Sequence, residues 1–309
     1  ENLNRRMLLS NTSLRAREWK KYNYEIDLIP YQPIDGSFSK LHKLFSYSIS
    51  CIKSSKYFIR YFRKHKVDAL YCNDFYAFYH ALIVSKLLRN KLYFTVRDLR
   101  QEEALFNLPW FIIFISATKV FVLSDDMKQV IISSYKKQNW LIKKFFNPEN
   151  VIVLPSIVEA TKTVKCSKIN NKIAILGACR EKKQQKQFIQ YALPKILKEI
   201  PDCILECIGD FDPVNDSYAK ECQLLIEKFD LKSSTNFLGH LSREELEKRK
   251  YSLVVVCSLN EGLSRSMIES VCRGIPVVSF DLCSAREILE KNYCGVVVTK
   301  NDFNQLANE

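Results

Sequence analysis

The stretch NEGLSRSMIES, residues 260–270, decides the fold because of what lies on either side of it. Before it, residues 253–257 read LVVVC, a continuous apolar run that is typical of a parallel strand buried on both faces. After it, Ser264 can cap a helix over residues 265–273, and residues 277–280 supply the next apolar strand. The order strand, loop, helix, strand predicts one βαβ unit.

The two glutamates of this stretch have different predicted places. Glu261 lies in the loop at the carboxyl end of a strand, where open α/β sheets bind their ligands. Glu269 lies about a turn and a half into the helix. Between them, the backbone N–H groups of Leu263, Ser264 and Arg265 form a helix N-terminus, which attracts anions. The arrangement suits a ligand with a phosphate and hydroxyl groups, and the alternative is a capped helix with solvated charges.

Strands and helices alternate in the same way throughout the second half. Predicted strands cover residues 172–179, 203–209, 236–241, 253–257, 277–280 and 294–298. Predicted helices cover residues 183–200 with a kink at Pro194, 218–229, 243–250, 265–273 and 285–290, and a further helix begins at Asp302. This alternation predicts a doubly wound parallel sheet.

The first half shows the same alternation but begins differently. Predicted strands cover residues 24–31, 67–74, 91–98, 119–126 and 151–155, and a helix covers 75–88. The chain opens on a charged segment, residues 2–21, that we predict to be helical, so the first strand is expected to be missing. We predict one Rossmann-like domain over residues 1–158, a linker over 159–171 and a second Rossmann-like domain over 172–309.

Positive charge is concentrated in the first half. Residues 1–158 carry 25 lysines and arginines against 13 acidic residues, whereas residues 159–309 carry 22 against 21. A basic half can face nucleic acid, an anionic membrane surface or a phosphorylated acceptor, or can simply be a soluble basic surface. No aromatic-interleaved basic motif is present, which argues against nucleic acid.

Cysteine and histidine usage restricts the class of protein further. The eleven cysteines form no C-x-x-C pair and lie mostly inside predicted strands and helices, as reduced core residues do, which favours a cytoplasmic protein. Four scattered histidines support neither a metal site nor a Ser-His-Asp triad. No apolar run reaches the roughly 18 residues of a spanning helix, and the longest, residues 108–115, predicts a buried helix or a shallow membrane contact.

A second loop complements the first. LGACREKKQQKQFI, residues 176–189, places Arg180, Lys182 and Lys183 after the first strand of the second half. The carboxyl ends of parallel strands open on one edge of the sheet, so these cations can face the helix N-terminus across a diphosphate. Arginine, lysine and amide dipoles can neutralise a leaving diphosphate without a metal ion.

These motifs, in this order, resemble the retaining glycosyltransferases of family four, also called glycosyltransferase group 1. Residues 261–269 match the family's E-x7-E motif, and residues 268–281, IESVCRGIPVVSFD, are similar to its continuation. Residues 176–189 resemble its phosphate loop, and NFLGHL at 236–241 resembles its V-x-FLG strand. The resemblance covers residues 172–309 and is weaker over residues 1–158.

The resemblance implies a GT-B fold, in which two Rossmann-like, doubly wound parallel-sheet domains face a central cleft. It implies that residues 1–158 form the acceptor-binding domain and residues 172–309 the nucleotide-sugar-binding domain. It implies that Glu269 holds the ribose hydroxyls, that Glu261 lies beside the transferred sugar, and that Lys183 contacts the diphosphate. Gly177 would open the phosphate loop, and the amides after Gly262 would assist binding.

Two residues depart from the family pattern. An arginine is usual where this chain has Ala178, so Arg180 would have to replace it, and a glycine is usual where it has Gln184.

Candidate acceptor-side residues lie at the ends of two predicted strands of the first half. Asn73 and Asp74 end one predicted strand, and Arg97 and Asp98 end another, so both pairs are candidates, with Asp98 also a candidate catalytic residue. The D-x-D sequence at residues 210–212 holds a metal in another class of glycosyltransferase, but here it follows a strand where this family has a turn, so no metal site is expected.

The sequence therefore predicts a retaining, metal-independent glycosyltransferase without a cofactor. The expected donor is a nucleotide-sugar, with a UDP-sugar preferred, and the expected acceptor is a glycan or lipid-linked hydroxyl in cell-envelope polysaccharide biosynthesis. The basic first half suggests peripheral contact with an anionic membrane from the cytoplasmic side. A nucleotide-sugar 2-epimerase of the same architecture and a degenerate, non-catalytic GT-B protein remain alternatives.

Overall fold

The computed structural model describes residues 6–10, 25–29, 40–97, 99, 106–156 and 170–309. Its contacts divide the chain into two compact units, one made of residues 1–96, 106–121 and 138–152 and the other of residues 97–105, 122–137 and 153–309. The predicted linker lies outside the described residues except for its last two positions. The domain boundaries proposed from the sequence therefore stay a prediction.

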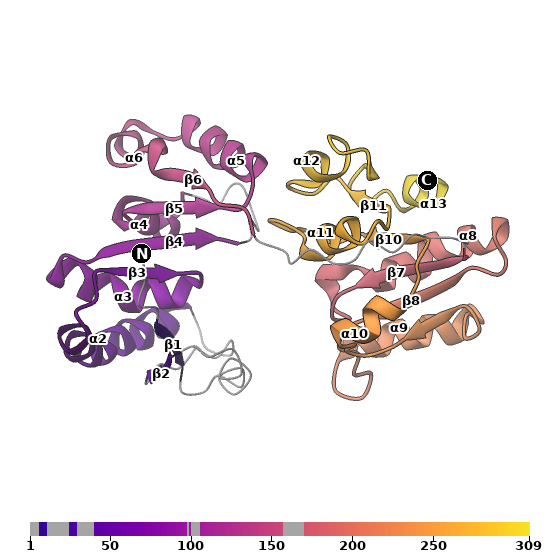
Figure 1. The fold of residues 1–309 in the computed structure, drawn as a ribbon, viewed down its shortest axis with the longest axis horizontal. Coiled ribbons are helices and arrows are strands. Elements are labelled where there is room, and N and C mark those ends of the chain that lie inside the picture. Colours follow the sequence, from indigo (N-terminus) through magenta and orange to yellow (C-terminus); the bar gives the residue numbers. More distant parts are fainter. Residues whose placement is uncertain (1–5, 11–24, 30–39, 98, 100–105, 157–169) are drawn as a thin grey trace. The chain divides into compact units, whose positions relative to one another are not determined.

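The second unit is built on a six-stranded sheet (Figure 1). The strands are β7 Lys172–Leu176, β8 Ile204–Ile208, β9 Thr235–Phe237, β10 Leu253–Val256, β11 Val277–Phe280 and β12 Gly295–Val298. Their spatial order is β12-β11-β10-β7-β8-β9, and every neighbouring pair is parallel. The strand order reverses between β7 and β10, so the crevice beyond the carboxyl ends of these two strands is the expected ligand position.

The helices of this unit follow the predicted order. They are α7 Gln185–Gln187, α8 Leu193–Glu199, α9 Ser217–Lys228, α10 Arg243–Lys248, α11 Arg265–Cys272, α12 Ala285–Leu289 and α13 Phe303–Asn308. The predicted kink at Pro194 is confirmed as a π turn over Phe188–Ala192 that directly precedes α8. The wider turn accommodates a residue that cannot donate a backbone hydrogen bond.

The core explains the apolar runs of the sequence. Ala174, Leu205 and Val277 on three different strands are fully buried, as parallel strands covered on both faces require. Seven of the ten cysteines among the described residues are buried, so the prediction that cysteines serve as apolar core residues is confirmed for those seven.

The first half contains a four-stranded sheet in the order β3-β4-β5-β6. Its strands are β3 Ala69–Cys72, β4 Lys91–Val96, β5 Lys119–Val122 and β6 Val151–Val153. The helices are α2 Lys40–His65, α3 Phe75–Leu88, α4 Leu108–Ser116, α5 Asp125–Lys136 and α6 Trp140–Phe145. Strands β3 and β4 pair in parallel, and the helix predicted over residues 75–88 is confirmed.

The predicted opening helix is wrong over the residues that the structure describes. Arg6–Ser10 forms strand β1, which pairs in parallel with β2, Glu25–Ile29. This five-residue segment has three apolar residues in a row, so it shows neither the 3.6-residue repeat of a helix nor the two-residue alternation of a strand. Its partner strand lies about fifteen residues further along the chain. A strand thus takes the place that the prediction gave to a helix.

Candidate functional site

Two glycines bring the loops after β7 and β8 into contact. Gly177 follows β7 with φ at 137°, and Gly209 follows β8 with φ at 143°. The Gly177 N–H donates to the Ile208 carbonyl oxygen at 2.8 Å, and the Cys179 N–H donates to the Asp210 carbonyl oxygen at 2.8 Å. A Cβ added at Gly209 would lie 2.4 Å from the Gly177 carbonyl carbon. Only glycine allows this approach, which shapes the floor of the site.

Replacing Gly209 with alanine is expected to lower the free energy of unfolding of the second unit by about 2–3 kcal/mol, from positive-φ strain and backbone overlap together. Urea unfolding followed by far-UV circular dichroism measures the change. Gly239→Ala is the matched control, because Gly239 has φ at 68° but nothing within 4 Å of an added Cβ. It should cost about 1 kcal/mol. Equal losses in the two variants would contradict the close approach.

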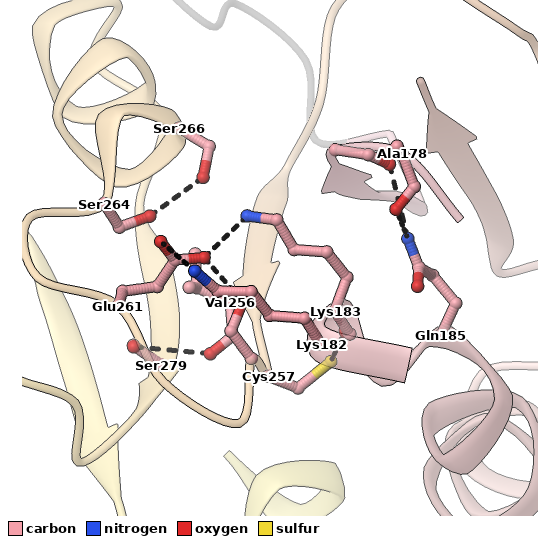
Figure 2. Close-up of polar contacts among 12 residues, drawn as sticks. Ala178, Lys182, Lys183, Gln185, Val256, Cys257, Glu261, Ser264, Ser266 and Ser279 are labelled. Atoms are coloured by element: carbon pink, nitrogen blue, oxygen red, sulfur yellow. Dashed lines mark hydrogen bonds and ion pairs between the residues drawn. The ribbon is translucent and has the colours of Figure 1, made fainter. Parts of the chain in front are cut away.

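Two lysines from the loop after β7 converge on the first glutamate of the E-x7-E motif (Figure 2). The Lys183 Nζ lies 2.8 Å from Glu261 Oε1, and the Lys182 Nζ lies 3.8 Å from Glu261 Oε2. The Ser258 hydroxyl also donates to Glu261 Oε1 at 3.0 Å. The Glu261 side chain is only 14% exposed, so its negative charge is balanced mainly by these neighbours. The structure thus brings together residues that are 78 positions apart in the sequence.

Backbone contacts fasten this loop to the end of β10. The Leu259 N–H donates to the Lys182 carbonyl oxygen at 2.8 Å, and the Cys257 thiol lies 3.3 Å from the Lys183 carbonyl oxygen. The Lys183 side chain also lies directly over Gly177, whose added Cβ would meet Lys183 Cε at 2.7 Å. The position of the Lys183 ammonium is therefore set by packing as well as by charge.

The residues after Lys183 explain one departure from the family pattern. Gln184 has φ 55° and ψ 30°, the left-handed conformation in which glycine is favoured. The next residue, Gln185, is fully buried, and its Nε2 donates to the carbonyl oxygens of Gly177 at 3.3 Å and Ala178 at 3.1 Å. Gln185 therefore shapes the loop from beneath (Figure 2). No sequence pattern indicates that Gln185 holds the loop, because the contact depends on a turn that brings the two ends of the loop together.

Arg180 does not take the position that the sequence prediction considered for it. It lies in an extended conformation just before the 3-10 turn Glu181–Lys183, its side chain is exposed, and it is not among the residues that line the pocket described below. The place of the absent arginine at Ala178 is therefore not filled by Arg180 in this structure. Lys182 and Lys183 are the cations of this loop that line the pocket.

The N-terminus of α11 lies across from the lysines. Ser264 occupies the N-cap position as predicted, but its hydroxyl pairs with the Ser266 hydroxyl at 3.0 Å and makes no capping bond to the helix. Glu269 lies in the second turn of the same helix, and both Glu269 and Arg265 line the pocket. The first amides of α11 are thus left without a side-chain cap, as an anion-binding helix terminus requires.

A pocket of about 860 Å³ lies within the second unit. Its lining includes Gly177, Lys183, Glu261, Leu263, Ser266 and Glu269. The volume lies within the usual range of small-molecule sites. The pocket therefore holds the carboxylates, cations and helix terminus that the sequence assigned to one ligand.

Arg273 is a pocket residue that the sequence reading treated only as the end of a helix. It is 4% exposed, and its Nη2 donates to the carbonyl oxygens of Leu246 at 2.6 Å and Arg249 at 3.1 Å. Burial lowers the pKa of the Arg273 guanidinium from its usual value. Arg273 thus holds the end of α11 against α10.

The candidates from the first half differ in where the structure places them. Asp74 accepts a hydrogen bond from the Ala77 N–H at 3.1 Å, which fits a cap at the start of α3, and Asn73 is exposed just after β3. Arg97, just after β4, lines the pocket, and its carbonyl oxygen would lie 2.3 Å from a Cβ added at Gly262. Asp98 lies outside the described residues. The acceptor-side assignments therefore stay predictions.

The D-x-D sequence forms a turn. Asp212 accepts hydrogen bonds from the N–H groups of Val214 and Asn215, both at 3.1 Å, and Phe211 stacks on Phe237 with ring centroids 3.9 Å apart. Across the part of the chain that the structure describes, no group of three or more His, Cys, Asp or Glu side chains could hold a metal ion.

The chain is similar to one protein family in sequence and to several solved structures in fold. The sequence model of the family described as "Glycosyl transferases group 1" matches residues 162–309, just under half of the chain. No curated protein matches the chain.

Solved structures are similar over nearly the whole length. Anabaena HepE, crystallised with UDP and glucose, is 19% identical with a TM-score of 0.75, covering 97% of this chain and 79% of its own. Sucrose-phosphate synthase from Thermosynechococcus elongatus is 16% identical with a TM-score of 0.71, covering 92% and 72%. The lipopolysaccharide outer core galactosyltransferase WaaB is 15% identical with a TM-score of 0.65, covering 98% and 78%. The chain therefore has the GT-B fold, with parallel-sheet α/β domains of four and six strands.

Proposed function

We propose that this glycosyltransferase moves a sugar from a nucleotide-diphosphate sugar to an acceptor hydroxyl with retention of configuration. The proposal rests on the match of residues 162–309 to the group 1 glycosyltransferase model and on the GT-B fold. The observation that carries the proposal is the convergence of Lys182, Lys183 and Glu261 opposite the uncapped N-terminus of α11. Fixed positive charge at this position suits a diphosphate leaving group.

The proposed donor is a UDP-sugar. Support comes from HepE, whose structure holds UDP and glucose, although at 19% identity the likeness itself extends only to the fold. In this proposal Lys183 and the first amides of α11 hold the diphosphate, and Glu269 accepts hydrogen bonds from the ribose hydroxyls. Arg265, at the N-terminus of α11, and Glu269 are four residues apart, about 6 Å along the helix axis, and both line the pocket, so one nucleoside diphosphate can contact both.

The proposed reaction needs no metal ion. As the bond between the sugar and the diphosphate breaks, negative charge grows on the phosphate oxygens, and the Lys183 and Lys182 ammonium groups together with the α11 dipole stabilise it. The acceptor hydroxyl attacks from the face that the diphosphate leaves, so the configuration is retained. Glu261, released from Lys183 by the phosphate, would then face the transferred sugar.

The proposed acceptor is a glycan or lipid-linked hydroxyl used in cell-envelope polysaccharide biosynthesis. The similarity to WaaB, a lipopolysaccharide galactosyltransferase, supports this class without fixing the sugar or the linkage. The basic first half supports peripheral contact with an anionic membrane from the cytoplasmic side. Across the described residues, no helix is both long enough and apolar enough to cross a membrane.

Isothermal calorimetry of UDP, GDP, ADP and CMP in EDTA tests the donor site. We expect UDP to bind with the highest affinity, and Glu269→Ala to weaken that binding at least about tenfold through loss of charge-assisted hydrogen bonds. Glu244→Ala, an exposed acid on α10 away from the pocket lining, is the control and should bind normally. Failure of every nucleotide to bind, or normal binding by Glu269→Ala, would remove the basis of the proposal.

Product analysis tests the reaction itself. With a UDP-sugar and a suitable acceptor, NMR of the new linkage should show the anomeric configuration of the donor. Formation of a 2-epimerised donor in the absence of any acceptor would instead favour the epimerase alternative.

A further inference from the structure

Helix α4 contains the apolar segment 108–115, which the sequence predicts to be a buried helix or a shallow membrane contact. Its Ile113 and Phe114 side chains are buried, and the Trp110 ring packs against three neighbouring aromatic rings at 5.6–6.0 Å between centroids. Leu108 is 70% exposed and Ile115 40% exposed. One side of α4 therefore packs into the core of the first half.

A different helix exposes large apolar side chains. In α6, Trp140 is 70% exposed, Leu141 49% and Phe145 55%. At about 100° per residue these three side chains fall within an arc of about 140° on the helix surface. The Lys144 side chain falls within the same arc, and its Nζ lies 5.9 Å from the centroid of the Phe145 ring. One side of α6 is therefore apolar and aromatic with a cation among the rings.

The exposure does not come from a loosely held segment. Asn139 caps α6 by accepting a hydrogen bond from the Ile142 N–H at 3.1 Å. At the other end Phe146 is 3% exposed, and its ring packs against Phe106 at 5.5 Å and Phe114 at 5.2 Å. The helix is fixed at both ends, so its apolar side is held toward solvent by the fold.

Helix α6 itself carries positive charge. Its six residues include two lysines, Lys143 and Lys144, which are both exposed, and no aspartate or glutamate. Lysines attract anionic headgroups while tryptophan and phenylalanine insert at the boundary between headgroups and acyl chains.

We propose that α6, with its Lys143 and Lys144, forms the surface through which the protein docks on an anionic lipid bilayer. Trp140, Leu141 and Phe145 would enter the interface, and the lysines would contact lipid phosphates. A lipid surface fits better than a folded partner, because a stable protein interface uses about 20–30 residues a side and α6 offers six. The inference concerns only the location of membrane contact and does not depend on the donor or the reaction.

Co-sedimentation with vesicles at 0.1 M salt tests the docking surface. We expect the full chain to bind vesicles of phosphatidylglycerol and phosphatidylcholine, and to bind pure phosphatidylcholine much more weakly. Lys143→Glu/Lys144→Glu should lower the partition coefficient at least about 20-fold, since each lysine near an anionic surface contributes about fivefold. Trp140→Ala/Phe145→Ala should lower it at least about tenfold.

Matched controls separate this surface from general charge and apolarity. Lys220→Glu/Lys228→Glu makes the same charge change on exposed lysines of α9, and Tyr293→Ala removes a side chain that is 97% exposed. Neither should lower binding more than about threefold. Quenching of tryptophan fluorescence by brominated lipids should be present in the wild type and largely lost in Trp140→Phe.

Several outcomes would overturn the proposal. They are absence of binding to anionic vesicles, equal loss in the control variants, and quenching that survives Trp140→Phe. Self-association in solution that disappears in Trp140→Ala/Phe145→Ala would assign the surface to a second copy of the chain instead. None of these results bears on nucleotide binding, so a failure here is distinguishable from a failure of the proposed transferase activity.

Discussion

Replacing Lys183 with alanine is expected to lower kcat/KM for sugar transfer by about two to three orders of magnitude. The Lys183 ammonium lies 2.8 Å from Glu261 and lines the same pocket as the N-terminus of α11, so it is the cation best placed to meet the leaving diphosphate. Its side chain is 22% exposed, which keeps solvent screening of its charge small. Single-turnover and steady-state assays would give the loss, and calorimetry would show how much of it is UDP affinity.

Neighbouring lysines provide controls for this effect. Lys182 lies farther from Glu261, at 3.8 Å, and its side chain is 42% exposed, so Lys182→Ala should cost only about three- to tenfold. Lys186 pairs with Glu221 at 2.7 Å on the side of α9, and Lys186→Ala should leave transfer unchanged. Similar losses in all three variants would indicate a general charge effect and not a specific phosphate contact.

Glu261→Gln should separate binding from chemistry. The Glu261 carboxylate pairs with the two lysines that the proposed diphosphate needs. Removing its charge should leave UDP affinity unchanged or make it several-fold tighter, while kcat falls because the residue beside the transferred sugar has changed. A matching loss of UDP affinity in Glu261→Gln and Lys183→Ala would instead mean that the ion pair only holds the loop in shape.

The second half of the fold was predictable because its signals are local. Five of its six strands are short, mainly apolar runs, and each helix begins or ends at a polar cap, glycine or proline, as at Ser264 and Gly274. The loops could then be placed at one sheet edge by topology alone. The sequence alone therefore predicts that Lys183, Glu261 and Glu269 lie in one pocket, and all three line it in the structure.

The remaining features depend on contacts that a local pattern does not contain. Arg180 is exposed and is not among the residues that line the pocket, and its backbone is extended while the next three residues form a 3-10 turn, a distinction that composition does not reveal. Gln185 acquires its role only when the loop folds over it. Strand β1 needs its distant partner, and α6 is too short to show a helical period.

Replacing Glu206 with glutamine is expected to lower the free energy of unfolding of the second unit by about 3 kcal/mol at pH 7. Glu206 lies in β8 and is 3% exposed, with the Tyr251 hydroxyl at 2.7 Å, Arg249 Nη1 at 2.9 Å and Lys172 Nζ at 3.3 Å. Glutamine keeps one acceptor oxygen but carries no charge, and its amide NH2 group places donors where the carboxylate accepts hydrogen bonds from two cations and a buried phenol. The Lys172 side chain is 39% exposed and the Arg249 side chain 35% exposed. Solvent therefore screens both cations, and we expect a loss of stability at the lower end of the range for a broken buried ion pair.

The same cluster gives this effect a defined pH dependence. Burial alone would raise the pKa of Glu206, but the hydrogen bonds from Tyr251 and Lys172 and the charge of Arg249 outweigh it and hold the pKa below the usual 4.5. A carboxyl whose pKa is lowered by folding stabilises the protein fully above its unfolded-state pKa, and this stabilisation is lost as the pH falls through the folded-state value. The difference between wild type and Glu206→Gln should therefore be constant from pH 7 to about 5 and shrink below about 4.5.

Hydrogen exchange of peptides from β8, measured by mass spectrometry, is the suitable probe for Glu206→Gln. The three tryptophans of the chain, Trp19, Trp110 and Trp140, all lie before residue 141, so their fluorescence does not report on this strand. Glu247→Gln is the control, because Glu247 pairs with Arg243 at an exposed position and should contribute less than about 0.5 kcal/mol. A difference that grows as the pH is lowered would mean that Glu206 is held protonated in the folded protein, and the cluster would then stabilise β8 by hydrogen bonding without an ion pair.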